Sequence, residues 1–195
     1  MLDVDDLIFA VMGATDSRRV EGRTKLQKLV FFVSEVMRVD AGYRPHFYGP
    51  YSAAVSAATE SQASRGALKE QVEAFPGTSG FSGNDAEFRR YVYELSAEGQ
   101  LALQWRREQN PAEFDKATTI AQQLLATGAD YRVLSYAAKL YYILQAEAQG
   151  RALTYEAARA RARELGWEMS AVEIDQGVTL LASMRLVTKQ RPSKS

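Results

Sequence analysis

Apolar side chains recur with a helical period in residues 22–37. They follow the spacing i, i+3, i+4, i+7 and i+11 at Leu26, Leu29, Val30, Val33 and Met37. This spacing places them on one side of an α-helix, which we expect to face the core. The turn-rich segment 38–52 follows and ends in the sequence YGPYS, in which Gly49-Pro50 predicts a tight turn.

The neighbouring segments predict two more helices and a hairpin. Residues 4–13 carry an amphipathic pattern that ends at a glycine, and residues 52–65 begin with Ser52 as an N-cap. Residues 67–75 and 88–95 have the alternation or the β-branched and aromatic content of strands, and a glycine-rich segment joins them. The polar residues 14–21 are expected to be a connector.

The order of these elements is helix, helix, helix, strand, long loop, strand. This order is typical of a winged helix-turn-helix, in which the third helix usually enters the major groove and the hairpin forms the wing. The fold class that we predict is therefore mainly α (α+β), with a winged helix in residues 1–109.

The remainder of the chain predicts a helical C-terminal domain, residues 110–195. Helix-start signals occur at Ser96, Asn110-Pro111, Asp130, Thr154 and Ser170, the last with Glu173 in a capping box. Residues 184–189 are predicted to form a short strand, which would make this half a second, degenerate helix-turn-helix. Residues 190–195 are predicted to be a frayed tail.

Composition excludes several classes of protein. The chain has 46% hydrophobic and 25% charged residues, no cysteine and one histidine. Disulfides, thiolate catalysis and zinc sites built from cysteine are therefore excluded, and we expect no metal, no cofactor and no enzymatic activity. An acidic N-terminus and the lack of a long apolar run predict a cytoplasmic protein without a membrane partner. The formal net charge is zero, so any binding of nucleic acid must come from a local arrangement of charge.

A set of basic and polar side chains is the candidate DNA interface. Phosphate contacts are predicted near the start of the helix 22–37 and at the base of the wing, and base contacts are predicted on the third helix. The set is Arg18, Arg19, Arg23, Lys25, Lys28, Ser52, Ser56, Thr59, Gln62, Arg89 and Arg90. The alternative is that the charged residues form a solvated surface, and that the alanine-rich third helix packs against a neighbour or contacts a protein.

Aromatic residues allow two interpretations as well. Tyr43, Phe47, Tyr48 and Tyr51 are expected to pack the connector against the helix 22–37, or else to stack on a base or a partner. The apolar helix that contains Tyr136, Tyr141 and Tyr142 is expected to be mainly core. Its alternative is the seam of a homodimer.

The sequences KLQKL at residues 25–29 and YGP at residues 48–50 resemble two related groups of proteins. These groups are the YwgA-like winged-helix proteins and the Panacea domain of SocA-type antitoxins. The segment YELSAEG at residues 93–99 is also similar to the strand-to-helix step of many bacterial winged-helix regulators. The resemblance covers about the first 100 residues and implies a prokaryotic or phage source, with a DNA-binding or antitoxin role.

Two hypotheses follow. The first is a homodimeric winged-helix protein that binds duplex DNA and regulates transcription or a defence or toxin locus. The second is a protein-interaction module, an antitoxin or adaptor, that uses the same fold to hold a toxin or another client protein.

Overall fold

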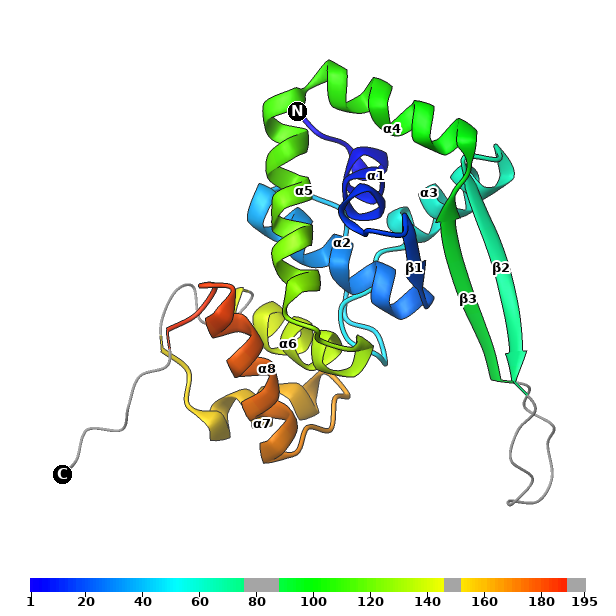
Figure 1. The fold of residues 1–195 in the computed structure, drawn as a ribbon. Coiled ribbons are helices and arrows are strands. Elements are labelled where there is room, and N and C mark those ends of the chain that lie inside the picture. The colour runs from blue at the N-terminus through cyan, green and yellow to red at the C-terminus, as the bar shows by residue number, and fades with distance from the viewer. Residues whose placement is uncertain (76–87, 146–151, 189–195) are drawn as a thin grey trace.

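A computed structural model of the chain describes residues 1–75, 88–145 and 152–188 (Figure 1). The chain is mainly helical (63% helix) with a small antiparallel sheet, which confirms the predicted α+β class. The elements in chain order are α1 (Val4–Ala14), β1 (Arg19–Glu21), α2 (Arg23–Met37), α3 (Ala53–Ser64), β2 (Leu68–Phe75), β3 (Phe88–Leu95), α4 (Ala97–Gln109), α5 (Pro111–Ala126), α6 (Tyr131–Ile143), α7 (Tyr155–Glu164) and α8 (Ala171–Ser183).

The helix boundaries follow the capping signals in the sequence. Asp3 and Asp6 form a capping box at the start of α1, and Ser52 accepts a hydrogen bond from the backbone N–H of Val55 at the start of α3. Ser96 caps α4 in the same way through Gly99. Because these side chains satisfy N–H groups that have no partner within the helix, each helix begins at the predicted place.

The sheet has the strand order β1-β3-β2, and both pairings are antiparallel. β2 and β3 form a long hairpin whose register pairs Leu68 with Leu95 and Phe75 with Phe88. The short strand β1 pairs with the opposite edge of β3, with Val20 opposite Tyr93. In Figure 1 the hairpin extends away from the helices on one side of the molecule.

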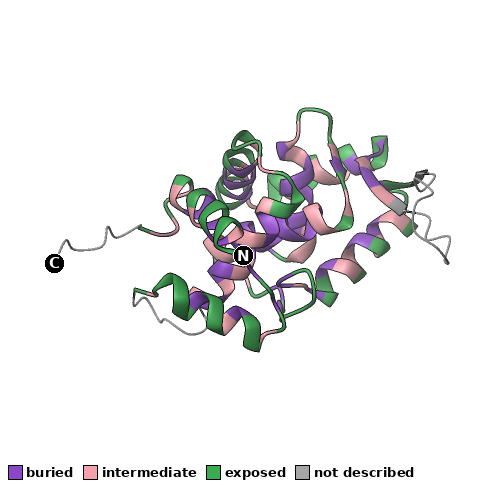
Figure 2. Cartoon of the chain, turned by 90° about the horizontal axis from the view of Figure 1, so that it is seen from below, coloured by how far each residue is buried: buried purple, intermediate pink, exposed green. Residues whose placement is uncertain are grey.

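The core is continuous from the first helix to the last. α5 packs against α1 and α2, α6 packs against α2, and α8 packs against α6. The buried apolar residues form one cluster that extends from Leu2 to Leu181. Figure 2 shows that burial follows the inward sides of the helices, while their outward sides are exposed. α5 belongs to the same core as α1. The predicted division of the chain at residue 110 stays a prediction.

Two predicted details of the secondary structure are wrong. Residues 19–21 form β1, although we expected a polar connector there; only Val20 in this strand is buried, so the sequence carries almost no periodic signal. Residues 184–188 form a turn and an extended end instead of a strand. In the described part of the chain, nothing pairs with this segment in a sheet. Lys189 and the predicted tail lie outside the described residues.

None of the described helices is both long enough and apolar enough to span a membrane.

Candidate functional site

Three arginines of the candidate DNA interface lie on the sheet and at the start of α2, and carboxylates pair with each of them. Arg19 lies 3.2 Å from Glu73 and 3.5 Å from Glu21. Arg90 forms ion pairs with the same two carboxylates. The positive charge that these arginines would present to a phosphate is therefore largely balanced within the sheet.

Arg23 has the most extensive set of partners in this group. Its Nε donates to the hydroxyl of Tyr93 at 3.1 Å, and its guanidinium lies 3.6 Å from Glu70 and 3.6 Å from the ring centre of Tyr91. The hydrogen bond to Tyr93 and the nearby Glu70 offset the cost of partial burial, and the pKa of Arg23 is raised. Arg23 thus holds α2 against the hairpin.

The other basic residues of the predicted interface are placed differently. Arg18 is exposed, has a left-handed backbone (φ 53°), and donates to the carbonyl of Gly13. Lys25 is half-buried on the first turn of α2. The side chain of Arg89 lies outside the described residues.

The polar residues predicted to read bases from α3 point mainly into the protein. Ser52, Thr59 and Gln62 are buried. Thr59 donates to the carbonyl of Val55 at 2.7 Å, and Gln62 donates to Asp5 of α1 at 3.0 Å. Their polar groups are hydrogen-bonded inside the molecule, so this structure does not present them to a base, and the predicted base contacts stay a prediction.

The outward side of α3 carries little that could recognise DNA. Ser56 is half-buried and donates to Glu60 at 3.3 Å. The exposed residues of the helix are Ala53, Ala54, Ala57, Glu60 and Ser64. This surface has one negative charge and no positive charge, so it would repel phosphates weakly.

Lys28 was predicted to contact a phosphate, yet its side chain is only 2% exposed. Its Nζ donates to the carbonyl of Pro50 at 2.5 Å. Burial of the ammonium group, reinforced by the positive charge of Lys139, lowers the pKa of Lys28 to about 7. Lys28 is therefore buried and bonded inside the protein, where it has no surface to offer to a phosphate.

The segment from Tyr48 to Ser52 is held against α2 mainly by Gln27. The side-chain amide of Gln27 donates to the carbonyl of Ser52 at 2.9 Å and accepts from its N–H at 3.1 Å. Tyr43 returns to the same helix and donates to the carbonyl of Gln27 at 2.8 Å. Buried hydrogen bonds thus join the KLQKL and YGPYS segments, with Gln27 bonded to Ser52 and Lys28 bonded to Pro50.

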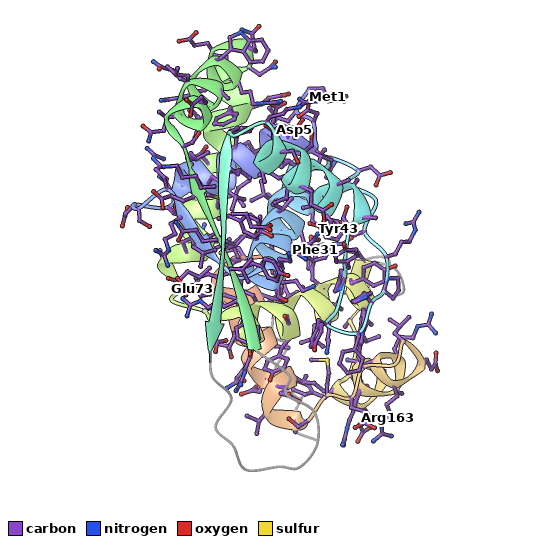
Figure 3. The ribbon with its side chains drawn as sticks, turned by 90° about the vertical axis from the view of Figure 1, so that its right-hand side faces the viewer. Met1, Asp5, Phe31, Tyr43, Glu73 and Arg163 are labelled. Atoms are coloured by element: carbon purple, nitrogen blue, oxygen red, sulfur yellow. The ribbon has the colours of Figure 1, made fainter. Side chains whose placement is uncertain are left out.

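The connector also joins the C-terminal helices to α2. The rings of Phe31 and Tyr43, which Figure 3 labels, pack edge to face with their centres 5.0 Å apart, and Tyr141 of α6 packs on Phe31. Farther along the chain, the indole N–H of Trp167 donates to the carbonyl of His46 at 2.6 Å. Tyr141 of α6 is thus buried within the chain, and Tyr142 packs edge to face with Trp167, while the homodimer seam stays a prediction.

Two aromatic residues of the connector remain exposed. Phe47 is 73% exposed and Tyr48 is 59% exposed, and their rings are in edge-to-face contact with each other. Of the two interpretations given for the connector aromatics, packing applies to Tyr43, whereas Phe47 and Tyr48 are free to contact a partner.

The sequence did not single out a second exposed apolar surface, which lies on α4. Leu101 is 69% exposed and Trp105 is 59% exposed, and they lie one helical turn apart. Glu98 and Glu108 are exposed at the positions three residues before and three residues after this pair. We call these four residues the α4 stripe. The signal that could have revealed it is a leucine and a tryptophan four residues apart in a helix that has otherwise few large apolar side chains.

Neither a metal-binding cluster in the described residues nor a similarity to a known protein points to a functional site. Among the described residues, no group of three or more His, Cys, Asp or Glu side chains is arranged to hold a metal ion. Comparison with protein-family models finds no match to this chain, and comparison with curated proteins finds no match either.

Proposed function

We propose that the chain is a non-enzymatic protein-interaction module built on a winged helix. The order of α1 to β3 and the strand order β1-β3-β2 support the winged helix, with α3 in the position of the recognition helix and β2–β3 as the wing. The resemblance of the KLQKL and YGP motifs to antitoxin domains is consistent with this role.

One observation carries the choice of a protein partner over DNA. Arg19, Arg23 and Arg90 are paired with carboxylates of β1 and β2, namely Glu21, Glu70 and Glu73. Binding to duplex DNA draws most of its affinity from unpaired cations that displace counterions from the phosphates. A surface with three cations and three anions offers little of that free energy.

The exposed apolar side chains support the same choice. Leu101 and Trp105 on α4, and Phe47 and Tyr48 on the connector, are uncovered in the single chain. Aromatic residues of this kind are enriched at the centres of protein interfaces. A protein partner would remove them from water, whereas a phosphate backbone would not.

Duplex DNA remains the second candidate, because the element order itself is that of many DNA-binding domains. Under this alternative Arg18, Lys25 and the wing would supply the phosphate contacts. The two candidates differ in their dependence on salt.

Fluorescence anisotropy with a mixed-sequence duplex at about 50 and 200 mM salt, the range in which phosphate contacts have their effect, tests the proposal. We expect no binding by the native chain at either salt concentration. A variant with Glu21→Gln, Glu70→Gln and Glu73→Gln should gain weak, salt-sensitive binding, since it removes the carboxylates that pair with Arg19, Arg23 and Arg90. Tight binding by the native chain that collapses at the higher salt would overturn the proposal in favour of DNA.

A further inference from the structure

The α4 stripe has the geometry of a helix-docking surface. Its four residues, at positions 98, 101, 105 and 108, recur at the three- and four-residue spacing of one helix side. The stripe extends over ten residue steps, which is about 15 Å along the helix axis. In Figure 1 α4 crosses one end of the molecule between the sheet and α5, so its outward side is open.

The opposite side of α4 is firmly attached to the protein. Arg106 lies 2.8 Å from Asp6 and 3.3 Å from both Asp3 and Asp5, all at the start of α1. Near the other end of the helix, Gly99 lies so close to the carbonyl of Ala67 that no Cβ could fit. Because the helix is fixed at both ends, the stripe is preformed and would lose little conformational entropy on binding.

The charge of the stripe is distinctive. Glu98 and Glu108 lie on either side of the two apolar residues, and neither forms an ion pair within the described part of the chain. Hydrogen bonds from its own backbone N–H and from Ser96, with a smaller contribution from the charge of Lys69, lower the pKa of Glu98, so it is ionised at neutral pH. Lys69 is thus near Glu98 without forming an ion pair with it, and both carboxylates are exposed to a cation of a partner.

We infer that the α4 stripe binds an amphipathic helix of a partner protein, one with large apolar side chains a turn apart and a lysine or arginine one turn beyond each end. This inference rests on the proposed protein-interaction function and names its partner class. When two helices pack at a shallow angle, side chains spaced three and four residues apart on one helix fit between those of the other. The apolar pair of the partner helix would therefore meet Leu101 and Trp105 at the centre of the contact. The two cations would then lie near Glu98 and Glu108 at the rim.

The complementary charges make the partner a basic helix. An acidic helix would place like charges opposite the two glutamates, which costs affinity and slows association. A helix with uncharged flanks would keep the apolar contact and lose the selectivity.

Two synthetic helical peptides test the inference with the full-length chain. Both have two leucines four residues apart in an alanine-glutamine background; the first carries lysines one turn beyond each leucine, and the second carries glutamates there. Binding can be followed by anisotropy of a dye on the peptide and by the emission of Trp105, because the only other tryptophan, Trp167, is buried. At about 50 mM salt we expect at least tenfold tighter binding of the lysine peptide, as opposed charges across an interface allow.

Variants of the stripe should change this preference in a defined way. Trp105→Ala or Leu101→Ser should weaken the lysine peptide at least tenfold, as expected for the anchors of an interface. The double variant Glu98→Lys and Glu108→Lys should prefer the glutamate peptide. Val172→Ser on α8 and Glu60→Lys on α3 are matched controls, because both residues are exposed away from the stripe, and they should change nothing.

Several results would overturn the inference. Equal affinity for the two peptides, no binding of either, or the same affinity in the Trp105→Ala variant would each do so. Self-association of the chain that Trp105→Ala abolishes would identify a second copy as the occupant instead. If the peptides do not bind and duplex DNA does not bind either, the proposed function stands and its partner must use another surface. Steep, salt-sensitive duplex binding would instead refute the proposed function itself.

Discussion

The Nζ atom of Lys28 lies 2.5 Å from the carbonyl oxygen of Pro50, inside the protein, with Lys139 as the nearby second cation. This contact joins the two motifs that drew attention in the sequence. It also brings a charged group into a position where water cannot solvate it, and the pKa of Lys28 falls from 10.5 to about 7. The contact therefore has a consequence for stability that depends on pH.

Lys28 should make the chain more stable as the pH rises from about 7 toward 10. The folded chain releases the Lys28 proton near pH 7, whereas the unfolded chain keeps it until the ordinary pKa of 10.5. Unfolding therefore takes up a proton in this window, and the free energy of unfolding increases with pH. The total effect between pH 7 and 10.5 is on the order of 5 kcal/mol, at 1.36 kcal/mol for each pKa unit.

Urea unfolding of the native chain and of Lys28→Met at pH 6, 8 and 10 measures this effect. The difference in unfolding free energy between the two should grow in favour of the native chain as the pH rises. Subtraction cancels the titration of Lys139 and the tyrosines, which both chains share. A difference that is the same at all three pH values would show that Lys28 is solvated.

Gln27 should be more important for stability than its polar side chain suggests. Replacing it with alanine leaves the buried N–H of Ser52 without a partner, while the Ser52 carbonyl keeps only the hydrogen bond from the N–H of Ser56. We expect a loss of about 1–3 kcal/mol, the cost of one unsatisfied buried group. Denaturant unfolding checks this value, with Gln104→Ala on the exposed side of α4 as a control that should change little.

Gln27→Glu sharpens the test. The carboxylate keeps the shape of the amide and can still accept from the N–H of Ser52, but it cannot donate to the carbonyl. It also buries a negative charge. If Gln27→Glu were as stable as the native chain at neutral pH, the paired hydrogen bonds to Ser52 would not be the reason for the buried glutamine.

The sequence predicted the helices because their signals are local. The caps at Ser52, Asp130 and Ser170 and the apolar spacing of α2 lie within a few residues of the backbone that they organise. β1 was missed because its stability comes from β3, about seventy residues later in the chain. Pairing over such a distance leaves no mark in a three-residue segment.

The candidate site was harder to predict for a similar reason. A lysine or an arginine in the sequence carries a charge, but its neighbours in the folded chain decide whether that charge is available. Lys28 lies on the helix side that carries the apolar core, and Arg23 meets Tyr91 and Glu70 only after the hairpin has formed. Conversely, Trp105 is a large apolar residue that is 59% exposed, while its neighbour Arg106 is the residue that meets α1.

Gly49 should tolerate alanine less well than Gly128 does. Both glycines have a positive φ, 96° and 68°, so alanine strains the backbone at either position. At Gly49 a Cβ would in addition lie 3.0 Å from Cγ of Lys139, whereas nothing lies within 4 Å at Gly128. We expect Gly128→Ala to cost about 1 kcal/mol and Gly49→Ala clearly more. Thermal unfolding of the two variants compares them directly, and equal losses would mean that Lys139 simply moves aside.

Arg106 should contribute more to stability than its neighbour Arg107. Arg106 is only 17% exposed and lies among three aspartates of the α1 terminus, and its guanidinium is 5.2 Å from the ring centre of Phe9. Removing the Arg106 side chain leaves the buried carboxylate of Asp6 without its cation. Arg107 pairs with Asp115 at the exposed surface, where ion pairs contribute about 0–1 kcal/mol.

Unfolding in urea at about 50 and 500 mM salt separates the two arginines, because salt screens exposed pairs much more than buried ones. We expect Arg106→Ala to lose about 2–3 kcal/mol at both salt concentrations, below the full cost of breaking a buried pair since water still reaches the aspartates. Arg107→Ala should lose clearly less than Arg106→Ala, and only at the lower salt, because its ion pair is exposed. Equal losses for the two variants would show that α4 is not fixed by Arg106. In that case Arg106 would not be what holds the α4 stripe in place, and the Arg106→Ala variant would bind the lysine peptide as well as the native chain does.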